Sequence, residues 1–186
     1  RQFRCGGLEE VIAKALTFYG VEPSYLMLEL TESMLMVEPE EAVARMTALK
    51  CLGVRLSLDD FGTGYSSLAY LSRFPIDQLK IDISFVRDII TDPGAATIAT
   101  SIIALAHRMR LNVVAEGVET EAQLGYLRQH NCDEMQGYLF SKPLPAGEFA
   151  GLLRQGRTLP VPAASLQSRT LLIVDDELPI LAALRR

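Results

Sequence analysis

The sequence predicts an α/β protein with a parallel sheet, in the manner of a (β/α)8 TIM-like barrel. Short apolar runs alternate with amphipathic helical patterns along most of the chain, which is typical of repeated strand–helix units. Each of five predicted strands also delivers polar or charged residues at or just past its C-terminal end. A doubly wound sheet collects its site from two or three strands at one point. Contributions from every strand in turn favour the barrel.

The predicted helices are amphipathic patterns, and the predicted strands are short apolar runs bounded by turn residues. A helix is expected over residues 8–19, where Leu8, Val11, Ile12, Ala15, Leu16 and Tyr19 share a stripe and Gly20 can cap the end. Further helices are expected from Pro39, over 68–72, over 95–109 with Ile98 and Ile102 in register, after the capping residue Thr120, and after Pro145. The strands between them are expected at 25–30, 54–58, 78–83, 112–115 and 135–140.

The polar groups at the strand ends are mostly carboxylates around one lysine. In strand order they are Glu29 and Glu32, Asp59 and Asp60, Lys80 and Asp82, Glu116 and Glu119, and Gln136. So many carboxylates cannot be buried as bare charges, and divalent cations would neutralise them. Oxygen ligands without Cys or His favour Mg²⁺ or Mn²⁺ over Zn²⁺.

The adjacent pair Asp59 and Asp60 is ambiguous. Neighbouring residues of a strand point to opposite faces, so both carboxylates reach one site only if the strand ends there. The glycines in residues 61–64 indicate that it does. Taken alone, the two aspartates before a glycine could form an ordinary turn. Lys80, taken alone, could be a surface lysine.

A carboxylate-bound metal combined with a lysine suits phosphodiester hydrolysis. The histidines, His107 and His130, fall on predicted helices away from the strand ends, so a histidine-based mechanism is not expected. The net charge of −5 argues against a nucleic-acid polymer as partner. Cys5, Cys51 and Cys132 form no metal-binding pair and suit a reducing cytoplasm. No stretch is long and apolar enough to predict membrane contact, although an upstream tether stays open.

Five segments together resemble the signature motifs of the EAL domain family. They are ELTES at 29–33, DDFGTGYSSL at 59–68, KID at 80–82, AEGVE at 115–119 and QGYLFSKPL at 136–144, within a match over residues 1–155. The resemblance implies a bacterial signalling enzyme that hydrolyses cyclic di-GMP to linear pGpG with Mg²⁺ or Mn²⁺ at a two-metal site. It also implies a homodimer formed through the barrel.

The resemblance assigns a role to each candidate residue. It makes Glu29, Asp59 and Asp60 metal ligands, Lys80 a catalytic residue that orients water and phosphate, and Glu116 the general base. Supporting or ligand-binding roles fall to Glu32, which would brace the loop at 61–67, and to Asp82, Glu119 and Gln136.

The resemblance also bears on the ends of the chain. The family's Glu-Ala-Leu motif and an asparagine ligand would precede Arg1, so we expect the first barrel strands to be missing and the 186 residues alone to be inactive. Residues 156–168 are predicted to be a linker. Residues 169–186 resemble the first strand and helix of a response-regulator receiver, with Asp175 and Asp176 as its acidic pair. An incidental surface tail is the alternative for this short apolar run that ends in acidic residues. A complete receiver would have a histidine kinase as partner.

Two functions of other classes stay open at this point. A catalytically silent EAL domain would act as a cyclic di-GMP receptor or a protein-interaction module. A purely structural output module would bind no nucleotide. The intact set of carboxylates and Lys80 favours the enzyme.

Overall fold

The computed structural model describes residue 3, residues 7–63, residues 68–156 and residue 158. The predicted receiver segment with Asp175 and Asp176, and most of the predicted linker, lie outside the described residues. Within the described part of the chain, no helix has the length and apolar character needed to cross a membrane.

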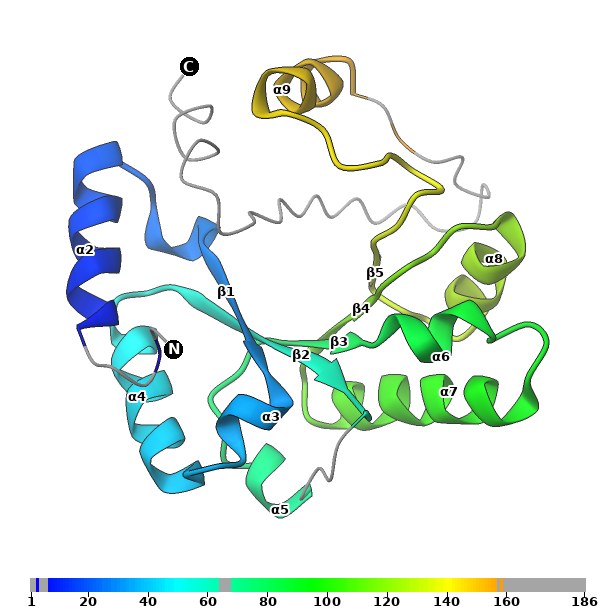
Figure 1. Ribbon diagram of the computed structural model, residues 1–186, viewed down its shortest axis with the longest axis horizontal. Helices are drawn as coiled ribbons and strands as arrows, with labels where there is room; N and C mark the ends of the chain where they lie inside the picture. Colours follow the sequence, from blue (N-terminus) through cyan, green and yellow to red (C-terminus); the bar gives the residue numbers. More distant parts are fainter. Residues whose placement is uncertain (1–2, 4–6, 64–67, 157, 159–186) are drawn as a thin grey trace.

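Among the described residues, five parallel strands form one sheet in the order β1-β2-β3-β4-β5 (Figure 1). A doubly wound sheet reverses its strand order at a switch point, whereas this order is strictly sequential, as in a barrel wall. The predicted α/β class and parallel, barrel-like sheet are therefore confirmed. The strands are β1 (Met27–Thr31), β2 (Arg55–Phe61), β3 (Gln78–Ile81), β4 (Asn112–Ala115) and β5 (Glu134–Met135).

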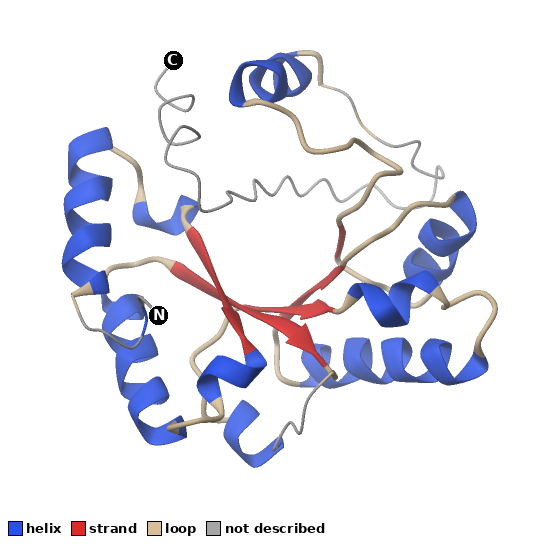
Figure 2. Cartoon of the chain, in the orientation of Figure 1, coloured by secondary structure: helices blue, strands red, loops and turns tan. Residues whose placement is uncertain are grey.

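The helices are arranged around the strands, which occupy the middle of the fold (Figure 2). Most lie where the sequence predicts them, including the one-turn helix α5, which precedes Pro75. The equally short α3 and α6 were not predicted, because about one turn shows no helical period. The helices are α2 (Leu8–Tyr19), the 3₁₀ turn η1 (Pro23–Tyr25), α3 (Glu32–Leu35), α4 (Pro39–Cys51), α5 (Leu68–Leu71), α6 (Ile83–Arg87), α7 (Pro93–Arg108), α8 (Glu121–Gln129) and α9 (Ala146–Arg154).

Two expected core residues are exposed. Val11 is 65% exposed and Ile98 is 40% exposed, so the predicted stripes of α2 and α7 are wrong at these positions. The buried residues of α2 are Ile12 and Leu16. Small residues such as Ala99 supply part of the buried face of α7, and a pattern read from large apolar side chains underweights them.

Several predicted strand boundaries also differ from the structure. β2 runs over Arg55–Phe61 and not over 54–58, and β3 ends at Ile81 and not at residue 83, because α6 begins at Ile83. β1 begins only at Met27, because Pro23–Tyr25 forms a 3₁₀ turn. β5 ends at Met135, well before Phe140. Gly137 lies so close to the loop between β4 and α8 that a Cβ on it would come within 2.1 Å of the carbonyl oxygen of Val118. The chain after β5 therefore packs across that loop instead of extending the sheet.

Aspartates secure the N-terminal edge of the sheet. Asp77 accepts hydrogen bonds from Lys50 Nζ at 2.7 Å and from the backbone N–H of Leu56 at 2.8 Å. Asp133 repeats the arrangement two strands later: its Oδ2 accepts from the N–H of Val113 and lies 2.9 Å from His107 Nε2. These bonds join helices and strands at the edge opposite to the candidate site.

Candidate active site

The C-terminal ends of four neighbouring strands bring charged side chains to one point. Because β1 to β4 are parallel, their C-terminal ends meet at one edge of the sheet. The Nζ atom of Lys80, on β3, lies 2.8 Å from Glu29 Oε2, 3.2 Å from Asp59 Oδ1 and 2.5 Å from Glu116 Oε1. One lysine thus contacts carboxylates from β1, from β2 and from the residue after β4.

The lysine side chain is only 4% exposed. Burial, the largest single influence, favours the neutral amine, but the hydrogen bonds and charges of Glu116 and Glu29 together outweigh it. The pKa of Lys80 is therefore raised above its ordinary value. Lys80 consequently stays a charged ammonium and offers a proton to each neighbouring carboxylate.

Asp59 and Asp60 reach the same site by a route that the sequence did not predict. The expectation that the strand ends at this pair is wrong, since β2 continues to Phe61. The register between β2 and β3 instead shifts between Leu58 and Phe61, and Asp60 adopts a left-handed conformation with φ of 56°. Such irregularities re-aim side chains beside active sites.

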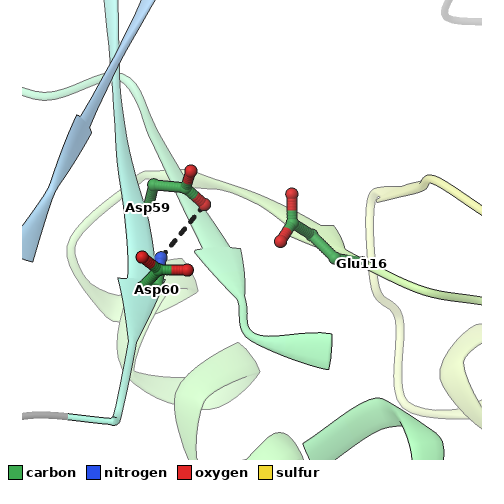
Figure 3. Close-up of side chains that lie close together, drawn as sticks. All are labelled: Asp59, Asp60 and Glu116. Atoms are coloured by element: carbon green, nitrogen blue, oxygen red, sulfur yellow. Dashed lines mark hydrogen bonds between the residues drawn. The ribbon is translucent and has the colours of Figure 1, made fainter. Parts of the chain in front are cut away.

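This change of register gathers three carboxylates. Asp59, Asp60 and Glu116 each place an oxygen within 4.8 Å of the others. Figure 3 shows Glu116 facing the aspartate pair, and the N–H of Asp60 donating to Asp59 Oδ1 at 3.0 Å. The donors are all carboxylate oxygens, which suits hard divalent cations such as Mg²⁺ and Mn²⁺.

The charges of this cluster are not fully compensated. Burial raises the pKa of Asp60, and the charges of Asp59 and Asp82 add to that effect against the opposing charge of Lys80. Burial likewise raises the pKa of Glu116, although its bond to Lys80 acts in the opposite direction. Both carboxylates therefore resist ionisation, as expected where a further cation is needed to balance them.

The remaining candidate residues surround this centre. Glu32 is 3% exposed and its Oε2 accepts from the backbone N–H of Gly62 at 3.4 Å. Asp82 caps α6 by accepting from the N–H of Ser84. Glu119 and Gln136 are exposed, and they enter the local structure through their backbones.

One buried residue of this region was not predicted. Gln123, on α8, is 6% exposed and forms hydrogen bonds with both the loop after β4 and the end of α6. The Thr-x-x-Gln spacing from Thr120 is a capping-box signal and could have identified half of its role. The contact with α6 has no local sequence signal.

Comparison with known proteins places the chain in a family. The model of the EAL domain family matches residues 2–143. The chain is 48% identical over 150 residues to the cyclic di-GMP phosphodiesterase NbdA of Pseudomonas aeruginosa, a match that covers 81% of this chain and 19% of NbdA. It thus spans about a fifth of the length of this curated relative.

Solved structures agree with this assignment. The fold is similar to the PaMucR phosphodiesterase in complex with c-di-GMP, with a TM-score of 0.77 and 43% identity, over 79% of this chain and 60% of that one. It is also similar to Klebsiella pneumoniae BlrP1 in a manganese/cy-diGMP complex, with a TM-score of 0.68 and 34% identity, over 72% of this chain and 34% of that one. The chain therefore belongs to the EAL domain family.

Proposed function

We propose that this chain is part of a phosphodiesterase that hydrolyses cyclic di-GMP to linear pGpG in bacterial signalling. The observation that carries the proposal is the buried Lys80 ammonium in contact with Glu29, Asp59 and Glu116. Phosphodiester hydrolysis needs positive charge near the phosphate and a group that accepts a proton from water. The cyclic di-GMP named for NbdA and PaMucR supports the choice of substrate.

Each residue has a part in this reaction. The Lys80 ammonium fixes the carboxylates and stabilises negative charge that develops on the phosphate. Glu116 accepts the proton of the attacking water, and its raised pKa brings it closer to the pH at which a base is efficient. Glu29, Asp59 and Asp60 would hold one or two Mg²⁺ or Mn²⁺ ions, which supply Lewis-acid polarisation of the phosphate when bound.

Further parts of the proposal rest on the sequence resemblance. Glu32, which accepts from the N–H of Gly62, would brace the loop at 61–67, of which residues 64–67 lie outside the described residues. Asp82, Glu119 and Gln136 would support the site or contact the nucleotide. The enzyme acts in the cytoplasm as a homodimer formed through the barrel. A complete receiver at the C-terminal side would place it under the control of a histidine kinase.

A product assay tests the enzyme against the silent receptor. The full-length gene product is incubated with cyclic di-GMP and Mg²⁺, Mn²⁺ or EDTA, and the nucleotides are separated by chromatography. We expect pGpG with either metal and intact substrate with EDTA. Intact substrate in every tube, together with nucleotide binding by calorimetry, would favour the receptor. No binding at all would favour a structural module.

A further inference from the structure

The loop that joins β4 to α8, residues 116–120, carries Glu116 at its start and is packed on more than one side. Val118 is 2% exposed, its N–H donates to Gln136 O, and its carbonyl accepts from the N–H of Leu139. Gly117 has φ of +69°, and a Cβ there would lie 2.2 Å from Cγ1 of Ile83, the first residue of α6. The loop is therefore enclosed between the chain after β5 and α6.

Gln123 fastens the same loop from α8. Its Oε1 accepts the backbone N–H groups of Glu119 and Thr120, both at 2.9 Å. Its Nε2 donates to the carbonyl oxygens of Val86 at 3.1 Å and Arg87 at 3.2 Å, at the end of α6. A side-chain amide has two acceptor sites and two donor hydrogens, so every one of them is used.

The two elements that Gln123 joins each carry a residue of the site. α6 begins three residues after Lys80, with Asp82 as its cap. The loop begins with Glu116, which contacts Lys80 at 2.5 Å. A bond between the loop and α6 therefore fixes one side of the site relative to the other.

We propose that Gln123 is a positioning residue of this site, which holds the loop of Glu116 against α6 and so maintains the contact between Glu116 and Lys80. The proposal rests on the proposed function for its catalytic consequence. Small displacements matter here, because a misplacement of about 1 Å can cost roughly 100-fold in rate.

A helix cap alone does not account for the geometry. The capping box needs only an acceptor at the third position, and Glu serves there as well as Gln. The donor half of Gln123 instead points to α6, which the cap of α8 does not require. Gln123→Glu therefore preserves the cap while it removes both bonds to α6 and places a carboxylate against two carbonyl oxygens.

The test compares Gln123→Glu with Gln129→Glu in the full-length gene product. Gln129 is the exposed last residue of α8, so it matches the chemical change on the same helix. We expect Gln123→Glu to lower kcat by about 10-fold or more, to weaken Mn²⁺ binding measured by electron paramagnetic resonance, and to speed hydrogen exchange at residues 116–120. Gln129→Glu should match the wild type in all three measurements.

The outcomes separate this inference from the proposed function. The positioning role would be overturned if Gln123→Glu had the same kcat, the same Mn²⁺ affinity and the same hydrogen-exchange rates as the wild type. Absence of pGpG with the wild type would instead sink the proposed function, while Mn²⁺ binding and exchange would still decide whether Gln123 holds the loop. If Gln123→Glu does not fold, the uncharged Gln123→Met is measured per folded molecule. Wild-type kcat in Gln123→Met would also overturn the proposal.

Discussion

The Nζ atom of Lys80 lies 2.5 Å from Oε1 of Glu116, with the lysine side chain 4% exposed. This contact joins β3 to the loop after β4 at the centre of the site. It links the raised pKa of Lys80 to the position of the proposed base. The predictions below depend on this contact and on the packing that maintains it.

Replacing Lys80 by Met should remove most of the activity. The variant keeps most of the length of the side chain but leaves Glu29, Asp59 and Glu116 without their common cation, and it removes charge stabilisation of the phosphate. We expect kcat/KM for cyclic di-GMP to fall by about 100-fold or more. Lys50→Met is the control, because Lys50 pairs with Asp77 at the other edge of the sheet and should affect stability alone. Activity of Lys80→Met within a few-fold of the wild type would contradict the assigned role.

Replacing Asp60 by Asn should stabilise the metal-free protein while it impairs the metal-loaded one. Asn also tolerates the left-handed conformation at this position. The pKa of Asp60 is raised in the folded state, so the wild type loses stability as the pH rises through that pKa, and the neutral variant does not. The stability gained by Asp60→Asn over the wild type should be absent near pH 3 and present at neutral pH. We expect roughly 1–3 °C in Tm, because solvent screens a partly exposed charge.

Thermal unfolding in EDTA at several pH values measures this difference. Asp92→Asn is the matched control, since Asp92 caps α7 and Asn caps a helix equally well. With Mn²⁺ present, Asp60→Asn should no longer be more stable than the wild type, and its activity should be at least about tenfold lower. A variant that is less stable than the wild type in EDTA at neutral pH would refute the electrostatic account.

Gly117→Ala should destabilise the fold through two separable effects. The new Cβ would meet Ile83, and the positive φ of Gly117 strains any residue with a side chain. We expect a loss of about 1–3 kcal/mol. The double variant with Ile83→Ala should recover the steric part only, with a coupling energy above about 0.5 kcal/mol.

Chemical denaturation of the four proteins in this cycle provides the measurement. Gly125→Ala is the control, because Gly125 lies inside α8 with open space around it and should gain about 0.5–1 kcal/mol. Simple additivity of Gly117→Ala and Ile83→Ala would show that the loop does not press on α6.

Asp77→Asn should separate stability from catalysis. The carboxylate accepts bonds from Lys50 and from the N–H of Leu56, and both are weakened when one oxygen becomes an amide. We expect a loss of about 1–3 kcal/mol in unfolding free energy. The kcat per folded molecule should stay unchanged, since Asp77 lies at the edge of the sheet opposite to Lys80. A lower kcat per folded molecule would indicate coupling between the two edges.

The sequence predicted the sheet and the centre of the site because both follow from short-range patterns. Strands such as 112–115 are short and mainly apolar runs, and a parallel sheet necessarily gathers the residues at their ends. The order of residues along the chain was therefore enough to place Glu29, Lys80 and Glu116 together. The motifs then restricted the chemistry to one family.

The remaining features depend on tertiary structure. Adjacent residues of a regular strand point to opposite faces, and the shift of register near Asp60 is what lets Asp59 and Asp60 reach the same site. Two adjacent aspartates in a sequence do not specify such a shift. The one-turn helix α6 has no helical period to detect, so its bond with Gln123 could not be predicted. The exposure of Val11 depends on which side of α2 packs against the rest of the fold. The spacing of apolar residues along the helix does not determine that side to within one residue.

Single-turnover hydrolysis tests the central claim most directly. The full-length gene product, in excess over cyclic di-GMP and with Mn²⁺ present, is mixed rapidly and pGpG is followed over time. Wild type and Glu148→Gln, a change of an exposed residue on α9, should form pGpG at the same rate. Glu116→Gln should bind the nucleotide and form pGpG about 100-fold more slowly or not at all. Equal rates in Glu116→Gln and wild type would show that the reaction does not depend on the centre around Lys80.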